Sequence, residues 1–205
     1  YDRAGTFVRS IGGPESNGGK FGHVNDIAFT RGGDLVVADS DSQQKGIYIM
    51  REDGTHVRSF GSKGTGRGRF GVIRGVAVGH DGSIAVADRD NACVHVFDME
   101  GRHVRSIGGQ GDGEGRLKNP SFVAIGTEGE VIVSDFGLKR VLVFSKEGKY
   151  LQSVGKGASA VESFKYPLGV AVDEDGVLYV ADTKSSNAPP GGPGRGIRMY
   201  RYSSA

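Results

Sequence analysis

The chain has 205 residues, of which 37% are hydrophobic, enough to bury the core of one domain of ordinary size. Its 26 basic and 24 acidic residues leave a formal net charge of +2, so overall charge gives no argument for nucleic-acid binding and only local placement can. A single cysteine, Cys93, excludes an intramolecular disulfide and a cysteine-based zinc site within the chain. The sequence shows no long apolar run and no signal peptide, and we expect a cytoplasmic protein.

The chain starts with a strand pattern at residues 5–12 and then repeats one unit four times. Each unit contains a short apolar run that ends in aspartate, and a glycine closes the last strand pattern of most units. The aspartates are Asp39, Asp88, Asp135 and Asp182, and the glycines are Gly12, Gly61, Gly108 and Gly155. Both series step by 49, 47 and 47 residues. Such a period indicates a repeat architecture.

Residues 70–108 show the unit most clearly. A short buried strand at residues 75–78 is followed by a hairpin turn at residues 80–82 and a second strand at residues 84–88. Two more turns lead to strands at residues 94–97 and 103–107. Four antiparallel strands with tight connections, joined to the next unit by a longer glycine-rich passage, are typical of a propeller blade.

The sequence therefore predicts an all-β fold, a β-propeller of four-stranded antiparallel blades, as a single domain over residues 1–205. The blades are expected at about residues 21–61, 70–108, 117–155 and 164–202. The last unit stops after its third strand, whereas the strand at residues 5–12 has no blade before it. We predict that the N-terminal strand completes the fourth blade and closes a ring of four, because this leaves no open sheet edge.

Several short motifs recur in the units and are best seen in the second one: Gly68–Phe70, Gly75–Val78, Val86–Asp88, Asn91 and Val94–Phe97. These motifs resemble NHL repeats. The segment at residues 199–202 is also similar to the end of the NHL domain in tripartite-motif (TRIM-NHL) ubiquitin ligases. The resemblance implies a module that supplies substrate or RNA specificity, with any ligase activity in a RING domain outside this chain. Because the family ring usually has six blades, a fragment of a six-bladed NHL propeller is the alternative to the closed ring of four.

The candidate catalytic residues do not share a position in the repeat. The five histidines, at positions 23, 56, 80, 95 and 103, predict no ring of metal ligands around a central channel. The four repeated aspartates would form a ring, but hydrogen bonds to backbone amides of the following connection explain them more simply. The sequence has neither a Gly-x-Ser-x-Gly elbow nor a P-loop. We expect a non-catalytic chain without metal or cofactor, and a metal-dependent propeller hydrolase or lyase is the less favoured alternative.

Basic residues gather in the connections that should form one face of blades two and three. These connections run from fourth to first strands and from second to third strands, and they emerge on the same side of a propeller. The predicted ligand-binding residues are Lys63, Arg67, Arg69, Arg74, Arg89, Arg116, Lys118, Phe136, Lys139 and Arg140. A long insertion at residues 183–196 is predicted on the same face.

This basic arc suits an acidic peptide or the phosphate backbone of RNA. The same charges are explained equally well as solvated loop residues. Proteins that bind single-stranded RNA usually add aromatic stacking groups, and Phe136 is the only obvious one here. We therefore favour a protein partner over RNA.

Overall fold

The computed structural model describes residues 3–12, 21–41, 46–155, 163–183 and 196–201. Four antiparallel sheets, which we number as blades one to four, follow one another along the chain. Blade one comprises β1 (Val24–Phe29), β2 (Leu35–Asp39), β3 (Gly46–Met50) and β4 (His56–Phe60). Blade two comprises β7 (Ile73–Val78), β8 (Ile84–Asp88), β9 (Cys93–Phe97) and β10 (His103–Gly108). Blade three comprises β11 (Pro120–Ile125), β12 (Val131–Asp135), β13 (Arg140–Phe144) and β14 (Tyr150–Val154).

Blade four has three strands among the described residues: β15 (Pro167–Val172), β16 (Val177–Asp182) and β17 (Gly196–Arg201). A small parallel pair, β5 (Ser62–Lys63) and β6 (Arg69–Phe70), lies in the connection between blades one and two. The predicted all-β architecture and the order of strands within each blade are confirmed. Most of the predicted insertion, residues 184–195, lies outside the described residues.

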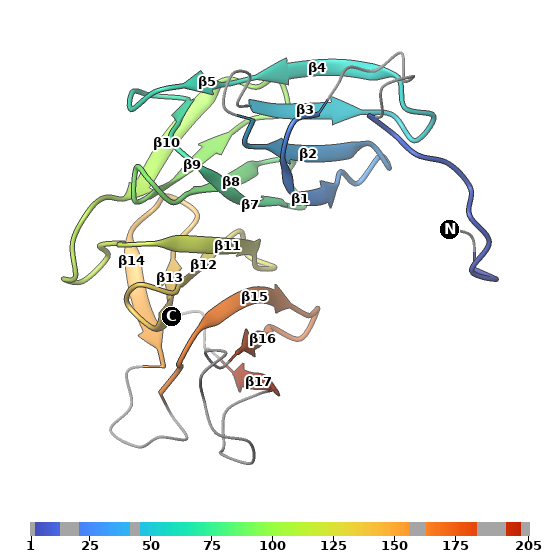
Figure 1. Ribbon diagram of the computed structural model, residues 1–205. Coiled ribbons are helices and arrows are strands. Elements are labelled where there is room, and N and C mark those ends of the chain that lie inside the picture. Colours follow the sequence, from blue (N-terminus) through green and yellow to red (C-terminus); the bar gives the residue numbers. More distant parts are fainter. Residues whose placement is uncertain (1–2, 13–20, 42–45, 156–162, 184–195, 202–205) are drawn as a thin grey trace.

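The middle strands of blades two and three are buried along their whole length, because each is covered by sheets on both faces. Their sequences are correspondingly continuous apolar runs, whereas the outer strands β4 and β10 carry exposed polar residues. The innermost strands β1, β7, β11 and β15 lie side by side around the inside of the assembly (Figure 1). A side chain at Gly75 of β7 would lie 2.8 Å from the backbone of Phe122 in β11, so glycine permits this close approach.

The glycine that ends each fourth strand leaves space for a large side chain of the following connection. A Cβ at Gly61 would lie 2.2 Å from the ring of Phe70, and one at Gly155 would lie 2.0 Å from the ring of Phe164. Both rings are buried between neighbouring blades, as predicted. Glycine is therefore required at this position for two reasons: the packing of the blade interface leaves no room for a side chain, and the turn has a positive φ.

Three apolar clusters hold the blades together in sequence order. One joins blades one and two around Phe70 and Phe97, and another joins blades three and four around Phe164. The cluster between blades two and three includes Val94, Val123 and Leu142. Because packed interiors resist deformation, these clusters fix the loops of neighbouring blades relative to each other.

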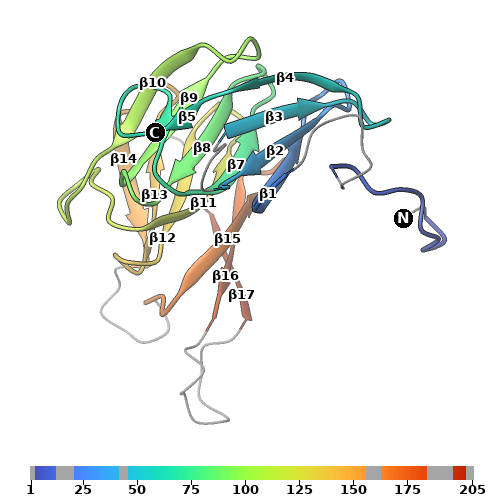
Figure 2. The ribbon, with the colours of Figure 1, turned by 45° about the horizontal axis from the view of Figure 1, so that its top comes forward.

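The predicted closure by the N-terminal strand is wrong. Residues 5–12 form no strand, and within the described residues β17 pairs only with β16. Ile11 approaches Gly54 of the β3–β4 turn, so the N-terminal segment lies beside blade one. In both views it is remote from β17, and the four blades form an open arc (Figures 1 and 2).

The two ends of the arc expose apolar side chains. Ile27 and Phe29 of β1 are 52% and 64% exposed, and Ile197 and Met199 of β17 are 73% and 68% exposed. Apolar side chains on the corresponding faces of blades two and three pack against the adjacent blade. This arrangement agrees with the alternative prediction, part of a larger propeller, and not with a closed ring of four.

Candidate functional site: the loop face and the inter-blade cavity

A buried aspartate at the end of each second strand holds the connections of one face, which we call the loop face. Asp88 accepts hydrogen bonds from the amides of Gly71 (2.8 Å) and Val72 (3.2 Å), in the connection that precedes its blade. It also accepts one from the amide of Asn91, in the turn that follows. Asp39, Asp135 and Asp182 make equivalent bonds to the preceding connection.

The structural interpretation of the repeated aspartates is thus confirmed, and it extends further than predicted. Bonds to the following turn recur in the three blades whose turn the structure describes, and bonds to the preceding connection, which were not predicted, recur in all four. Burial by itself would raise the pKa of Asp88, but the nearby His95 ring (3.8 Å) and hydrogen bonds from Gly71 and Asn91 hold that pKa below its ordinary value. The carboxylate therefore remains ionised and acts as a fixed acceptor.

Two connections of the loop face have nearly the same backbone. In the first, at residues 61–70, the amide of Gly64 donates to the Phe70 carbonyl (2.9 Å). In the second, at residues 108–117, the amide of Gly111 donates to the Leu117 carbonyl (2.9 Å). Each loop is also bonded to its own blade by a side chain, as described below. These loops are consequently ordered platforms for the side chains they carry.

Six of the predicted basic residues are exposed on the loop face. They are Lys63, Arg67, Arg69, Arg116, Lys118 and Lys139, and we call them the basic loop surface. Their loops belong to blades two and three, which the shared apolar cluster packs together. The basic loop surface therefore does not depend on closure of the ring.

The other three basic residues of the prediction are not free surface charges. Arg89 forms an ion pair with Asp90 (2.9 Å), which offsets its charge. Arg74 is half-buried in the innermost strand β7. Arg140 is buried, and its Nη2 donates to the carbonyl of Asp112 (2.6 Å).

Arg140 must be corrected from a ligand-binding residue to a structural one. It bonds the 108–117 loop to blade three, as the Asn91 side chain bonds the 61–70 loop to blade two through the Gly64 carbonyl (2.9 Å). Its sequence position beside Lys139 gave no indication of this, because Lys139 lies in a turn with positive φ whereas Arg140 is the first residue of β13. A buried cation that binds carbonyl oxygens orders the loop, and it is not available to a partner.

Phe136 has an aromatic neighbour that the sequence did not reveal. Its ring lies 6.2 Å from that of Tyr166 with an interplanar angle of 19°, a stacked arrangement. Phe136 is 36% exposed, so the pair presents aromatic surface at the edge of blade three that faces blade four. The two residues come from different blades, which explains why no local pattern predicts their contact.

A polar cluster inside blade two was also not predicted. His95 Nδ1 lies 2.9 Å from Ser106 Oγ and 3.3 Å from His103 Nε2, and Cys93 Sγ lies 3.4 Å from His95 Nε2. Burial, together with the charges of His95 and Arg67, lowers the pKa of His103. Burial raises the pKa of the Cys93 thiol to about 12. Within the described part of the chain, no three histidine, cysteine or acidic side chains are placed to hold a metal ion.

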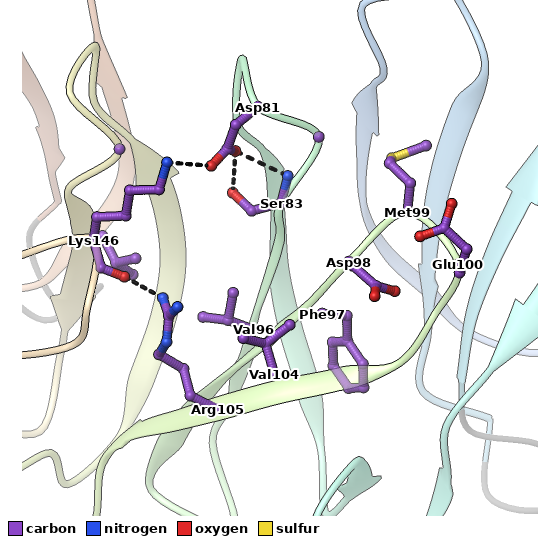
Figure 3. Close-up of a pocket in the computed structure, with 13 residues that line it drawn as sticks. Asp81, Ser83, Val96, Phe97, Asp98, Met99, Glu100, Val104, Arg105 and Lys146 are labelled. Carbon is purple, nitrogen blue, oxygen red and sulfur yellow. Dashed lines mark hydrogen bonds and ion pairs between the residues drawn. The ribbon is translucent and has the colours of Figure 1, made fainter.

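A cavity of about 400 Å³ opens between blades two and three on the opposite face, which we call the turn face because the hairpin turns lie there. Figure 3 shows Val96, Phe97 and Val104 in its middle part. Asp81 and Lys146 lie at one end, and Asp98 and Glu100 lie at the other (Figure 3). We call this space the inter-blade cavity. Its residues come from separate units, so only the packing of two blades brings them together and no sequence motif could have identified it.

Polar contacts cross the inter-blade cavity at one end. Lys146 of blade three forms an ion pair with Asp81 of blade two (2.8 Å), and Arg105 Nη1 donates to the Lys146 carbonyl. Hydrogen bonds from Lys146 and Ser83 hold the pKa of Asp81 well below its ordinary value, and the same ion pair raises the pKa of Lys146. At the other end both Asp98 and Glu100 bind one guanidinium, that of Arg102 (2.6 and 3.1 Å).

Comparison with known families agrees with this geometry. A family model described as a 6-bladed beta-propeller matches residues 70–153, and an NHL repeat model matches residues 164–187. These matches support an NHL-type propeller. The TRIM-NHL relationship in particular is not shown. No curated protein matches the chain.

Solved structures of similar fold are remote in sequence. A protein of unknown function from Bacteroides caccae is 18% identical over 78% of this chain and 53% of its own, with a TM-score of 0.57. Hydrazine synthase from Kuenenia stuttgartiensis is 15% identical over 98% of this chain and 49% of its own, with a TM-score of 0.64. A virginiamycin B lyase from Staphylococcus aureus is 10% identical over 89% of this chain and 56% of its own, with a TM-score of 0.61. The chain thus spans about half the length of these structures, and the likeness shows the fold alone.

The described residues contain no helix that is long and apolar enough to cross a bilayer.

Proposed function

We propose that this chain is a non-catalytic interaction module that recognises an acidic segment of a protein partner through the basic loop surface. The observation that carries the proposal is the pair of ordered loops at residues 61–70 and 108–117. Both loops are fixed by backbone bonds and by a side chain of their blade, and together they expose four cations, partly offset by the carboxylates of Asp112 and Glu114. Because the backbone that carries these cations is already ordered, binding does not have to order the loops, which favours charge-assisted bonds to carboxylates.

The finer form of the proposal follows the resemblance to TRIM-NHL ligases. In that form the partner is a substrate of a ubiquitin ligase, and the ligase activity belongs to a RING domain outside this chain. The proposal places the protein in the cytoplasm, since its one cysteine is buried and unpaired.

RNA is the second candidate ligand, and the stacked pair of Phe136 and Tyr166 is the observation that favours it. Single-stranded RNA binds where cations track the phosphates and aromatic rings stack on bases. Here the aromatic surface adjoins blade three, which carries Lys118 and Lys139. We rank RNA second because the Tyr166 ring already covers one face of the Phe136 ring.

Titrations with two defined probes test the proposal. The probes are a labelled peptide of alternating glutamate and serine, and a labelled oligouridine, each measured at low and at moderate salt. We expect saturable binding of the peptide, and a loss of about tenfold in affinity in the double variant Arg67→Glu, Arg69→Glu.

A charge-matched control separates the basic loop surface from overall charge. Arg31→Glu with Lys149→Glu makes the same change in net charge at exposed turns of the opposite face. The control should retain wild-type affinity. Equal losses in both double variants, or no binding of the acidic peptide, would contradict the proposal, whereas binding of oligouridine alone would establish RNA as the ligand.

A further inference from the structure

The inter-blade cavity has the size and lining of a binding site. Its volume of about 400 Å³ falls within the usual range for ligand pockets, roughly 300–1,000 Å³. Val96, Phe97 and Val131 form buried apolar walls, but Val104 of the outer strand is 50% exposed at the same place. An apolar side chain of a ligand that covered Val104 would remove this surface from water.

Acidic groups outnumber basic ones around this space. The lining residues include three carboxylates, of Asp81, Asp98 and Glu100, and two cations, of Lys146 and Arg105. A second hollow of about 250 Å³ shares Asp81, Gly129 and Lys146 with the cavity and adds Glu128. The two hollows therefore adjoin at these shared residues, and a segment of extended chain can contact both.

The unbalanced charge lies at the end that Asp98 and Glu100 form. Lys146 and Asp81 neutralise each other at the opposite end, where Glu147 also lies near Arg105. In contrast, Asp98 and Glu100 share the single guanidinium of Arg102, which leaves one negative charge in excess. Glu100 and Arg102 are more than half exposed, so a cation can reach this end without displacing buried groups.

We propose that the inter-blade cavity binds an extended, basic peptide segment of a protein partner, with an apolar side chain against Val104 and a lysine or arginine beside Asp98 and Glu100. Met99 lies over Gly82 at the same rim, where a Cβ on the glycine would be 2.8 Å from the Met99 Cγ. The flexible thioether side chain can shift to fit the incoming segment. This site is on the turn face and recognises the opposite charge, so it does not rest on the basic loop surface.

The test is a fluorescence titration with the labelled peptide Lys-Leu-Lys-Leu-Lys at moderate salt. Replacement of its leucines by serine should weaken binding about tenfold, because the apolar contact with Val104 is lost. In the protein, Val104→Arg should weaken binding of the leucine peptide about tenfold or more, and Glu100→Gln about twofold to fivefold.

Val57→Arg is the matched control variant. Val57 occupies the corresponding position of the outer strand in blade one and is also exposed, at 38%. The Val57→Arg variant should bind the peptide as the wild type does. Thermal melting should show that Val57→Arg and Val104→Arg both fold. Arg67→Glu with Arg69→Glu should also leave this binding intact, which separates the inference from the function proposed for the loop face.

Three results would overturn the inference. One is equal binding by Val104→Arg and Val57→Arg, and another is equal affinity for the leucine and serine peptides. The third is the absence of saturable binding of the leucine peptide to the wild type.

Discussion

Replacement of Asp88 by alanine should destabilise the protein by about 3–5 kcal/mol. The carboxylate is fully buried, and it accepts bonds from the amides of Gly71, Val72 and Asn91 and from the Asn91 side chain (2.7 Å). Each buried donor left without an acceptor costs about 1–3 kcal/mol, and some of these part-buried donors will recover a bond to water. The expected loss is a large fraction of the roughly 5–15 kcal/mol that stabilises an ordinary domain.

Urea unfolding followed by circular dichroism measures this loss directly. The control is Asp90→Ala, because Asp90 lies in the adjacent turn and forms an exposed ion pair with Arg89, worth about 0–1 kcal/mol. Unfolding of Asp88→Ala at the same urea concentration as the control would contradict this prediction. A change below about 1 kcal/mol would equally show that the carboxylate does not hold the loops.

The pH dependence of this difference provides an independent check. Because the pKa of Asp88 is lower in the folded protein than its ordinary value, the ionised group stabilises the fold above the pKa of the unfolded chain. That contribution is lost as the pH falls through the depressed folded value. The difference in stability between the wild type and Asp88→Ala should therefore shrink in acid, provided that both remain folded enough to measure.

Two further predictions concern packing. Gly61→Ala should destabilise the protein by several kcal/mol, because its Cβ would lie 2.2 Å from the Phe70 ring. The control Gly33→Ala, also at positive φ but with open space around it, should cost about 1 kcal/mol. Urea midpoints of the two variants test this prediction, and equal midpoints would contradict it. Cys93 should react with a thiol reagent much more slowly in the native protein than in urea, since burial raises its pKa to about 12, and a fast native reaction at neutral pH would show that blade two opens.

Local features of the sequence predicted the blades well, because each strand is bounded by residues with a specific local role. Asp88 and its equivalents end the second strands and cap the connections, and Gly61 and its equivalents make room for an interface side chain. Period and turn chemistry are therefore enough to place strands within a blade. They also placed Phe70 and Phe164 correctly between blades.

Features that depend on the arrangement of blades were not predictable in the same way. The strand pattern at residues 5–12 suits any fourth strand, and its pairing depends on the rotation between blades, which side-chain packing at the interfaces sets. Arg140 looked like a loop cation, but the fold of the 108–117 loop places its carbonyl groups around the guanidinium. The contact of Asp81 with Lys146 likewise exists only because blades two and three pack together.

Hydrogen exchange of the protein with and without the acidic glutamate–serine peptide tests the central claim most directly, because it locates the bound probe on the chain. If the peptide binds at the basic loop surface, backbone amides in the loops at residues 61–70 and 108–118 should exchange more slowly, with the turns at residues 79–83 and 98–102 unchanged. Protection of those turns without protection of the loops, or no protection at saturating peptide, would show that the basic loop surface is not the binding site.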